Sequence, residues 1–435
     1  MSGITGLLFL DGRPVEADTL SGMTAALAHR GPDGSGRWVQ GSAGLGHHML
    51  WSTPESLTEK LPYEHAASGL VVTSDARIDN RDELLAQLGL DRRRERPIGD
   101  SEIIAAAYER WGEDCPDRLI GDFAFAIWDA RRQGFFCARD CFGVKPIYYY
   151  HHRGHLFAFA SEIKALLRLN EVPRRLNEAR VADYLASVSD DKAATFYAGI
   201  LRIPPAHCLW VDSEGLRIRE YWRLDPSREL RLGSDEAYAE TFREVFTEAV
   251  RCRVRSAFPV GSTVSGGLDS SSIACVASGM LNAPETPPFH TFSFVFDAVP
   301  ESDERAYIEA ALSVLSAEKH YVHPDRFGVF GDVERTLWHL DQPPFIRNLY
   351  LWKALYEDAR KAGVRVLLDG EDGDTVISRG DATLYHIAME GRWEEFERII
   401  RSPQMQHYAN YSVDPFYWLY KYGFPALQDQ LRGRA

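Results

Sequence analysis

One stretch of the sequence places strong limits on the fold. The apolar segment VGSTV at 260–264 runs into SGGLDSSS and then into a segment with apolar residues at helical spacing. Gly266 and Gly267 have no Cβ, so backbone N–H groups can approach phosphate oxygens closely, and the start of the helix would turn its positive end toward the same anion. The hydroxyl donors of this loop are Ser265, Ser270 and Ser271. We predict a phosphate-binding loop, with an ordinary Gly-Ser turn as the alternative; a Walker loop is excluded because GxxxxGK[ST] is absent.

A second apolar segment, VRVLLD at 364–369, is followed by an acidic loop. Ligands of open α/β sheets bind beyond the carboxyl ends of the strands. Carboxylates from two neighbouring loops suit a hard cation on a polyphosphate, and we predict that Asp374 is a Mg²⁺ ligand. The alternative is a solvated acidic loop, although its carboxylates repel one another unless a cation or donors intervene. The loop consists of Asp369, Gly370, Glu371, Asp372, Gly373 and Asp374.

The sequence pattern changes near residue 225. Residues 1–224 contain many short segments rich in β-branched and aromatic residues, broken by Gly, Pro and Asp. In residues 225–435, longer helical patterns alternate with almost continuously apolar segments that are typical of parallel strands: VGSTV, TFSFVF and VRVLLD. At about 150 residues per domain, the 435 residues suit two or three domains. We expect an α+β domain followed by an α/β domain.

Charge and hydropathy exclude two classes of partner. The chain has 49 Lys and Arg against 63 Asp and Glu, a net charge of -14, whereas binding to a nucleic-acid backbone depends on clustered cations. No stretch approaches the roughly 20 apolar residues of a membrane helix, and the start of the chain lacks the basic region of a secretion signal. We expect a cytoplasmic protein with no nucleic-acid partner and no membrane insertion.

SGGLDSS resembles the pyrophosphate loop of ATP pyrophosphatases, which cleave ATP between its α and β phosphates. The chain also resembles the asparagine synthetase superfamily in six further motifs: AHRGPDGSG, LGHHML, DSEII, FAFAIWD, ARDCFGVKPIYYY and FASEIKALL. The resemblance implies an Ntn-hydrolase-like αββα sandwich at 1–224, and a pyrophosphate-loop, adenine nucleotide α-hydrolase-like parallel-sheet domain at 225–435. It also implies ATP and Mg²⁺ as cofactors, Asp269 as a Mg²⁺ ligand, and Gly370 beside the loop serines and glycines as an ATP-binding residue.

Departures from the family pattern affect the first domain. Glutaminases of this family begin Met-Cys-Gly-Ile, but residue 2 here is Ser2, so the thiolate nucleophile is missing. The arginine expected to bind the glutamine carboxylate aligns with Met49, and an expected Asn-Gly-Glu aligns with Ser-Asp-Ala at 74–76. Asp100 is retained, with a helix N-cap as its alternative role. We expect this domain to keep its fold without hydrolysing glutamine, leaving the second domain to use an amine already present on its substrate.

The sequence of the acidic loop indicates which kind of ligase within this family the chain resembles. Asparagine synthetases carry Ser-Gly-Glu-Gly-x-Asp-Glu, whereas LDGEDGDTVISRG at 368–380 is similar to the Leu-Asp-Gly-x-Asp-Gly-Asp word of lasso peptide cyclases. Such a ligase adenylates an Asp or Glu side chain of a precursor peptide and joins it to the peptide's N-terminal amine, releasing AMP and pyrophosphate. A leader-binding protein and a leader peptidase are its implied partners. Glu371 aligns with a glutamate given a proton-accepting role in asparagine synthetases, and an ordinary loop carboxylate is the alternative.

The sequence is also compatible with other functions. Within the enzyme class, the alternatives are an asparagine synthetase-type or a β-lactam synthetase-type ligase. Outside it, the chain would be a catalytically incompetent scaffold that binds nucleotide or peptide. Relatives usually continue through a helical segment that supplies a lysine for the departing pyrophosphate, so we expect the second domain to be short at its C-terminal end. Lys421 is the only lysine after Lys361, and no motif assigns it that role.

Overall fold

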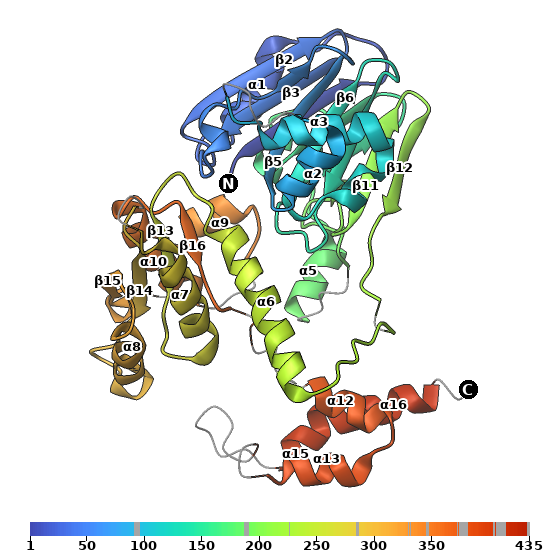
Figure 1. Ribbon diagram of the computed structural model, residues 1–435. Coiled ribbons are helices and arrows are strands. Elements are labelled where there is room, and N and C mark those ends of the chain that lie inside the picture. Colours follow the sequence, from blue (N-terminus) through green and yellow to red (C-terminus); the bar gives the residue numbers. More distant parts are fainter. Residues whose placement is uncertain are drawn as a thin grey trace. The chain divides into compact units, whose positions relative to one another are not determined.

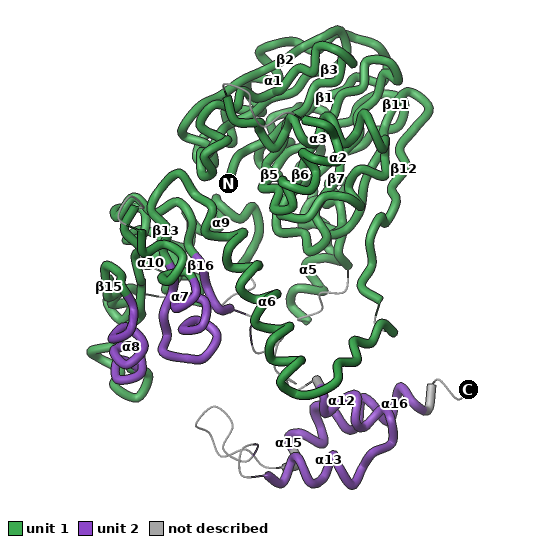
Figure 2. Tube along the Cα trace, in the orientation of Figure 1, with its two compact units in different colours: residues 1–261, 277–303, 316–367 green, residues 262–276, 304–315, 368–435 purple. Residues whose placement is uncertain are grey.

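The structure is a computed structural model that describes residues 1–90, 96–186, 191–225, 227–283, 287–328, 330, 332–344, 348–371, 373, 382–402, 405 and 415–432. It divides into two compact units that interleave along the sequence (Figure 1, Figure 2). Unit 1 comprises Met1–Gly261, Ala277–Asp303 and Ser316–Leu367. Unit 2 comprises Ser262–Val276, Glu304–Leu315 and Leu368–Ala435, and it contains both the phosphate loop and the acidic loop.

The first half of unit 1 is built from two six-stranded sheets whose strand pairs are antiparallel. The first sheet has the order β10 (Ile200–Arg202), β8 (Tyr148–His152), β9 (Leu156–Ala160), β1 (Gly3–Phe9), β3 (Ala43–Met49) and β2 (Gly34–Gln40). The second has the order β12 (Gly215–Glu220), β11 (His207–Asp212), β7 (Gly134–Arg139), β6 (Gly121–Asp129), β5 (Leu70–Ile78) and β4 (Tyr63–His65).

Side chains that alternate along each strand fill separate layers. Ile4 and Leu8 of β1 belong to the core between the two sheets, whereas Leu7 and Phe9 belong to the core under the outer helices. The central strands are buried on both faces, which explains why TGLLFL and FAFAIWD are apolar at almost every position. Helices α1 (Ala17–Ala25) and α4 (Ile163–Leu166) cover one sheet, and α2 (Arg81–Leu88) and α3 (Asp100–Trp111) cover the other. The predicted αββα sandwich is confirmed.

The second half of the chain contains a four-stranded sheet with the order β15 (Glu318–Val322), β14 (His290–Phe294), β13 (Val260–Thr263) and β16 (Val366–Leu368). Strands β14 and β15 are parallel, and Phe292 and Val322 pack against α10 (Leu349–Lys361). The three predicted apolar segments are strands. Strand β15 was not predicted because it is polar and lies at the edge of the sheet, where little of it is buried.

Helix α7 (Leu268–Leu281) connects β13 to β14, and α8 (Arg305–Leu312) connects β14 to β15. Helices α5 (Glu178–Leu185) and α6 (Asp235–Arg253) precede the sheet, while α9 (Val333–Leu340) and α10 lie between β15 and β16. After β16 come α12 (Ala382–Met389), α13 (Trp393–Ile400), α15 (Pro415–Trp418), the π-helical turn η6 (Leu419–Gly423) and α16 (Phe424–Arg432). Trp418 is buried in the core of this last group with Phe396. Among the described residues, no helix combines the length and the apolar character needed to cross a bilayer.

The sandwich predicts a large effect for one buried ring. Phe159 of β9 is fully buried, and its ring makes an edge contact with Phe135 of the opposite sheet at a centroid distance of 5.7 Å. We expect Phe159→Ala to lower the free energy of unfolding by about 3–5 kcal/mol, measured by urea denaturation. Phe142→Ala removes the same atoms from a side chain that is 79% exposed, and it should cost about 0.5 kcal/mol or less. Equal losses in the two variants would contradict the sandwich.

Candidate active site

The phosphate loop in unit 2 is held by its own hydroxyl groups. The backbone N–H of Ser265 donates to Oγ of Ser270 at 3.1 Å, and the two serine hydroxyls are 2.9 Å apart. The N–H of Gly267 donates to Oγ of Ser265 at 3.3 Å. These bonds fold the loop back over the first turn of α7, as expected of serines that compete for backbone donors near a helix start.

Glycine is required at the tip of the loop for two independent reasons. Gly266 has φ of +79°, in the left-handed region that favours glycine. A Cβ at this position would also lie 2.5 Å from Cβ of Tyr307, on α8. The backbone of the phosphate loop therefore rests directly on α8, and a larger residue at 266 would lift it away.

The acidic loop contacts the phosphate loop through two further glycines. A Cβ on Gly370 would lie 2.7 Å from the backbone nitrogen of Ser270, and a Cβ on Gly373 would overlap the carboxylate of Asp269. The N–H of Gly373 donates to the carbonyl of Gly370 at 3.2 Å, which closes a turn between them. Because these positions lack side chains, the carboxylate of Asp269 lies against the backbone of the acidic loop.

The remaining predicted site residues have different surroundings. Glu371 is exposed in the acidic loop, and its N–H donates to Oδ1 of Asp369 at 3.1 Å. Ser271 is on the first turn of α7, and its Oγ is buried without a hydrogen-bond partner among the described residues. An acceptor such as a phosphate oxygen would satisfy that hydroxyl. Asp374 lies outside the described residues.

The donor atoms of the two loops suit Mg²⁺. Asp269 and Asp369 supply carboxylate oxygens, and the backbone and serines supply further oxygens, while neither 265–271 nor 369–374 contains Cys or His. Oxygen ligands are those that Mg²⁺ prefers, whereas softer metals prefer nitrogen and sulfur. The structure thus brings together the two predicted loops, and the roles of their residues stay predictions.

In unit 1, Ser2 occupies a buried polar pocket. Its N–H donates to Oδ1 of Asp75 at 3.2 Å, and its hydroxyl accepts a hydrogen bond from the N–H of Leu50 at 3.1 Å. The same hydroxyl lies 3.8 Å from Sδ of Met49. The residue at the nucleophile position of the family's glutaminases is therefore a serine whose hydroxyl is already engaged, beside an apolar side chain where an arginine is expected.

Asp75 pairs with both cations of this pocket. It lies 3.1 Å from Nζ of Lys145 and 3.4 Å from Nη2 of Arg30. Burial by itself raises the pKa of Asp75, but the positive charges of Lys145, the amino terminus and Arg30 together lower it more, so the net pKa is below the usual value. The carboxylate is charged near neutral pH, and it offsets the positive charges of Lys145 and Arg30.

The retained Asp100 is also engaged. The guanidinium of Arg81 donates to its carboxylate, and the N–H of Ile78 approaches Oδ2 at 3.4 Å. The alternative role of Asp100 as an N-cap is wrong, because Gly99 is the N-cap and α3 begins at Asp100. Burial raises the pKa of Asp100, and Arg81 offsets this only in part.

A charged network leads from the pocket to the loop after α9. Glu162 contacts Nε2 of His29 at 3.0 Å and Nη1 of Arg30 at 2.9 Å, and it pairs with Lys164. Burial opposes ionisation of Glu162, but hydrogen bonds from His29 and Lys164, with the charges of Lys164 and Arg30, lower its pKa to about 2. The N–H of Lys164 donates to Oδ2 of Asp341 at 3.0 Å. Both halves of the chain thus contribute to this network within unit 1.

Several residues that contact the site residues were not predicted from the sequence. Arg30 lies in AHRGPDGSG and Lys145 in ARDCFGVKPIYYY, words that indicated the family without giving these cations a role. Tyr307, which supports Gly266, has no local motif that marks it. The pairing of Arg30 and Lys145 with Asp75 depends on residues more than forty positions apart, so no sequence spacing could have revealed it.

Comparisons with known proteins agree with these two halves. A family model described as a glutamine amidotransferase domain matches residues 1–222, and one described as asparagine synthase matches residues 241–430. The "Asparagine synthetase [glutamine-hydrolyzing] 3" of Bacillus subtilis is 30% identical over 89% of this chain and 64% of that protein. The "Amidase chry2" of Gibberella zeae is 29% identical over 82% of this chain and 54% of that protein.

A third relative, the "Putative asparagine synthetase [glutamine-hydrolyzing] 2" of Methanocaldococcus jannaschii, is 28% identical over 87% of this chain and 75% of that protein. The chain thus spans between 54% and 75% of the length of these three relatives. A solved glutamine phosphoribosylpyrophosphate amidotransferase from B. subtilis matches 87% of this chain and 93% of its own at 14% identity, with a TM-score of 0.37. On the two family models and these relatives, the chain belongs to the asparagine synthase family, with a glutamine amidotransferase domain followed by an asparagine synthase domain.

Proposed function

We propose that this chain is an ATP-dependent carbon–nitrogen ligase that releases AMP and pyrophosphate. The supporting observation is the close approach of Gly370 and Gly373 to Ser270 and Asp269, which places the acidic loop beside a loop that carries serine hydroxyls, backbone N–H groups and a carboxylate. Donors of this kind stabilise phosphate oxygens, and fixed donors stabilise the charge that develops as pyrophosphate leaves. The glutamine amidotransferase and asparagine synthase matches support the same reaction class.

The proposed reaction has two steps. In the first, a carboxylate oxygen of the substrate attacks the α-phosphorus of ATP, the bond from that phosphorus to the α–β bridging oxygen breaks, and pyrophosphate leaves. In the second, an amine nitrogen attacks the acyl carbon, the bond from that carbon to the adenylate oxygen breaks, and AMP leaves. An amine that arrives as an ammonium loses one proton before attack and another on the way to the amide. Glu371, exposed in the acidic loop, is the proposed acceptor of the first proton.

Asp269 would hold Mg²⁺ from the phosphate loop, and Asp374 stays the predicted second ligand. When bound, Mg²⁺ would offset the negative charge of the phosphates. Residues of the chain make the other contacts. Loop N–H groups and Ser271 bind phosphate oxygens, and Gly370 allows the acidic loop to approach the phosphate loop. The source of the amine is a separate question, on which the N-terminal pocket bears.

The N-terminal pocket supports an amine supplied by the substrate itself. Ser2 replaces the cysteine nucleophile, Met49 replaces an arginine, and Asp75 neutralises Arg30 and Lys145. These features disfavour both the attack on a glutamine amide and the binding of a glutamine carboxylate. Together with the LDGEDGD word at 368–374, they favour macrolactam formation in a precursor peptide, as in a lasso peptide cyclase.

Asparagine synthesis is the second candidate. It is favoured by the similarity to the Bacillus subtilis and Methanocaldococcus jannaschii relatives, which are both named asparagine synthetases. With the N-terminal pocket blocked, that reaction would need free ammonia. The two candidates share the adenylation step and differ only in the carboxylate and the amine.

The deciding assay incubates the full chain with ATP, Mg²⁺ and either a linear precursor peptide or aspartate with ammonium. Macrolactam formation should give AMP, pyrophosphate and a peptide lighter by one water, detected by mass spectrometry. AMP with asparagine would favour the second candidate. ADP as the product would overturn the adenylation mechanism, and nucleotide binding without turnover of either substrate would leave a scaffold.

Asp269→Ala should lower the rate of pyrophosphate release by about 100-fold or more, because it removes the carboxylate that the acidic loop contacts. The control is Asp358→Ala, which removes an exposed partner of Lys361 on α10 and should leave the rate unchanged. Equal rates in wild type and Asp269→Ala would contradict the metal assignment.

Gly370→Ala should weaken ATP binding about tenfold or more, measured by calorimetry, because the added Cβ would lie 2.7 Å from the nitrogen of Ser270 and separate the loops. Gly279→Ala is the matched control on α7. Its Cβ meets nothing within 4 Å, so it should keep ATP affinity and slightly stabilise the helix. Unchanged affinity in Gly370→Ala would show that the loop contact is not needed for nucleotide binding.

Glutamine should not release ammonia with this chain, and Ser2→Cys alone should not restore release. The reason is that Met49 and the Asp75 ion pairs would still exclude the glutamine carboxylate. Ammonia can be measured with a coupled glutamate dehydrogenase assay, with a glutaminase as positive control. Release by wild type at the rate of AMP formation would contradict the proposed source of the amine.

A further inference from the structure

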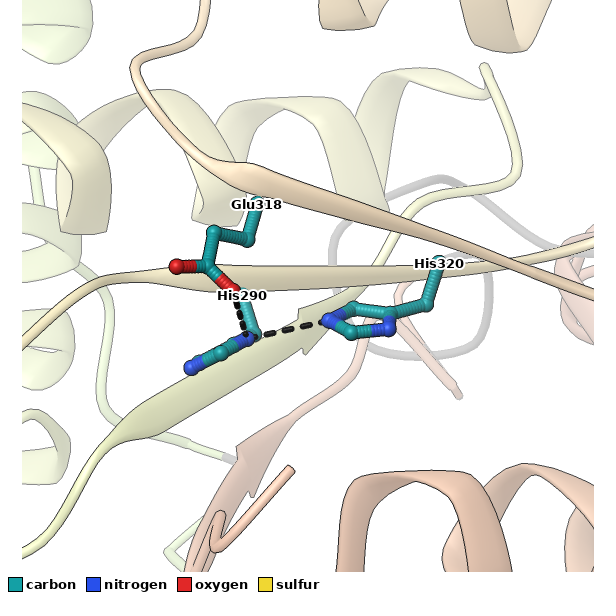
Figure 3. A group of neighbouring side chains, drawn as sticks. All are labelled: His290, Glu318 and His320. Atoms are coloured by element: carbon teal, nitrogen blue, oxygen red, sulfur yellow. Dashed lines mark hydrogen bonds and ion pairs between the residues drawn. The ribbon is translucent and has the colours of Figure 1, made fainter. Parts of the chain in front are cut away.

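Three side chains of unit 1 that neither sequence motifs nor the proposed reaction explain converge on one edge of the four-stranded sheet (Figure 3). His290 is the first residue of β14, and Glu318 and His320 lie on β15. In the parallel register, His290 is opposite Glu318 and Phe292 is opposite His320. Glu318 and His320 are two residues apart and so point to the same face of the strand. Strand pairing thus accounts for the cluster.

The ligand atoms of the cluster are close enough to share an ion. One ligand atom from each residue lies within 4.8 Å of the others. Nδ1 of His290 is 3.0 Å from Nε2 of His320 and 3.5 Å from Oε2 of Glu318. Ligands about 2.0–2.1 Å from a tetrahedral zinc ion are themselves about 3.3 Å apart, so these separations bracket the expected value.

We propose that this chain binds a divalent transition-metal ion, with Zn²⁺ the best match, through Nδ1 of His290, Nε2 of His320 and the carboxylate of Glu318. Two imidazoles and one carboxylate form a donor set that suits zinc, whereas Mg²⁺ and Ca²⁺ prefer oxygen ligands alone. This inference does not depend on the proposed ligase activity.

The neighbours of the two ring nitrogens of His290 support an ion at this position. His290 is 4% exposed, and its Nε2 is buried with no hydrogen-bond partner among the described residues. The polar neighbours of this ring therefore lie on its Nδ1 side, where Nε2 of His320 and a carboxylate oxygen of Glu318 are both close. In either tautomer a single proton on one of the two ring nitrogens joins only two of these three atoms well, whereas a cation would attract all three.

Aromatic packing holds the two rings in place. The ring of Phe292, which is fully buried, stacks on His320 with a centroid distance of 4.6 Å and an interplanar angle of 13°. The side chain of Glu318 is 62% exposed, so solvent reaches the cluster, and water would complete a four-coordinate ion. His290 and Glu318 are at the amino ends of their strands, whereas substrates of open α/β sheets bind at the carboxyl ends. The ion would therefore secure the edge strand β15 to β14 rather than take part in chemistry.

The test uses the full chain without an affinity tag, freed of metal by a chelator and titrated with Zn²⁺ in excess Mg²⁺, which occupies the oxygen-ligand sites. We expect one Zn²⁺ per chain, a higher thermal midpoint with Zn²⁺, and visible absorption typical of tetrahedral coordination when Co²⁺ replaces Zn²⁺. Glu318→Gln and His320→Gln should each lower Zn²⁺ affinity about tenfold or more and remove the thermal shift. These variants change partly exposed side chains, so folding can be verified by circular dichroism.

Two controls make the outcome specific. His323→Gln alters a nearby histidine that pairs with Asp297 instead, and it should bind Zn²⁺ like wild type. Asp269→Ala, in the phosphate loop, should also keep the site. Failure of wild type to bind Zn²⁺ stoichiometrically would overturn the proposal. So would equal Zn²⁺ affinity in wild type, Glu318→Gln and His320→Gln, or loss of Zn²⁺ in Asp269→Ala alone. None of these results bears on release of AMP, so the two proposals fail separately.

Discussion

The approach of the acidic loop to the phosphate loop depends on the absence of side chains at Gly370 and Gly373. A Cβ at Gly370 would meet the backbone of Ser270 in the first turn of α7, and a Cβ at Gly373 would displace the carboxylate of Asp269. Glycine is also required at position 266, because the left-handed backbone of Gly266 and its contact with Tyr307 fix the distance of the phosphate loop from α8. Three glycines thus decide how close a carboxylate comes to the loop donors. The serines then satisfy one another, except for the hydroxyl of Ser271.

Paired charges stabilise the buried polar pocket of the N-terminal domain. Burying an ion is costly unless it is paired, and removing one member of a buried pair leaves the other exposed to that cost. Asp75 therefore cannot be replaced alone, since Arg30 and Lys145 would lose their counter-ion. Arg30 also pairs with Glu162, which extends the same dependence to His29 and Lys164. The charges of this pocket therefore depend on one another, and replacing one of them alone leaves others without a partner.

Sequence patterns predicted the features that depend on residues close together in the chain. Glycine and serine at 265–271 indicated the loop because they act within one turn of backbone, and alternating or continuous apolar segments indicated both sheet types. Long-range pairings were missed. Strand β15 has the polar pattern of an edge strand, so neither its presence nor the meeting of His290 with His320 could be inferred before the register was known. The alternative role of Asp100 as a helix N-cap was wrong, because Gly99 is the N-cap of α3 and Arg81 pairs with the carboxylate of Asp100. Asp374 stays a prediction that the described residues do not reach.

The domain without a predicted reaction still supports the other half. Nη2 of Arg365, just before β16, donates to Asp33 at 3.0 Å, and Nη2 of Arg253, at the end of α6, donates to Asp122 at 3.0 Å. The N–H of Ala257, which precedes β13, donates to the carbonyl of Ser52 at 2.8 Å. Partly buried pairs of this kind fix orientation because each leaves a charge or a backbone donor unsatisfied if the partner is removed. The strands that lead into both loops thus begin at contacts with the N-terminal sandwich. A fragment that starts after residue 225 would lack these partners, so the chemistry of the second half has to be measured in the full chain.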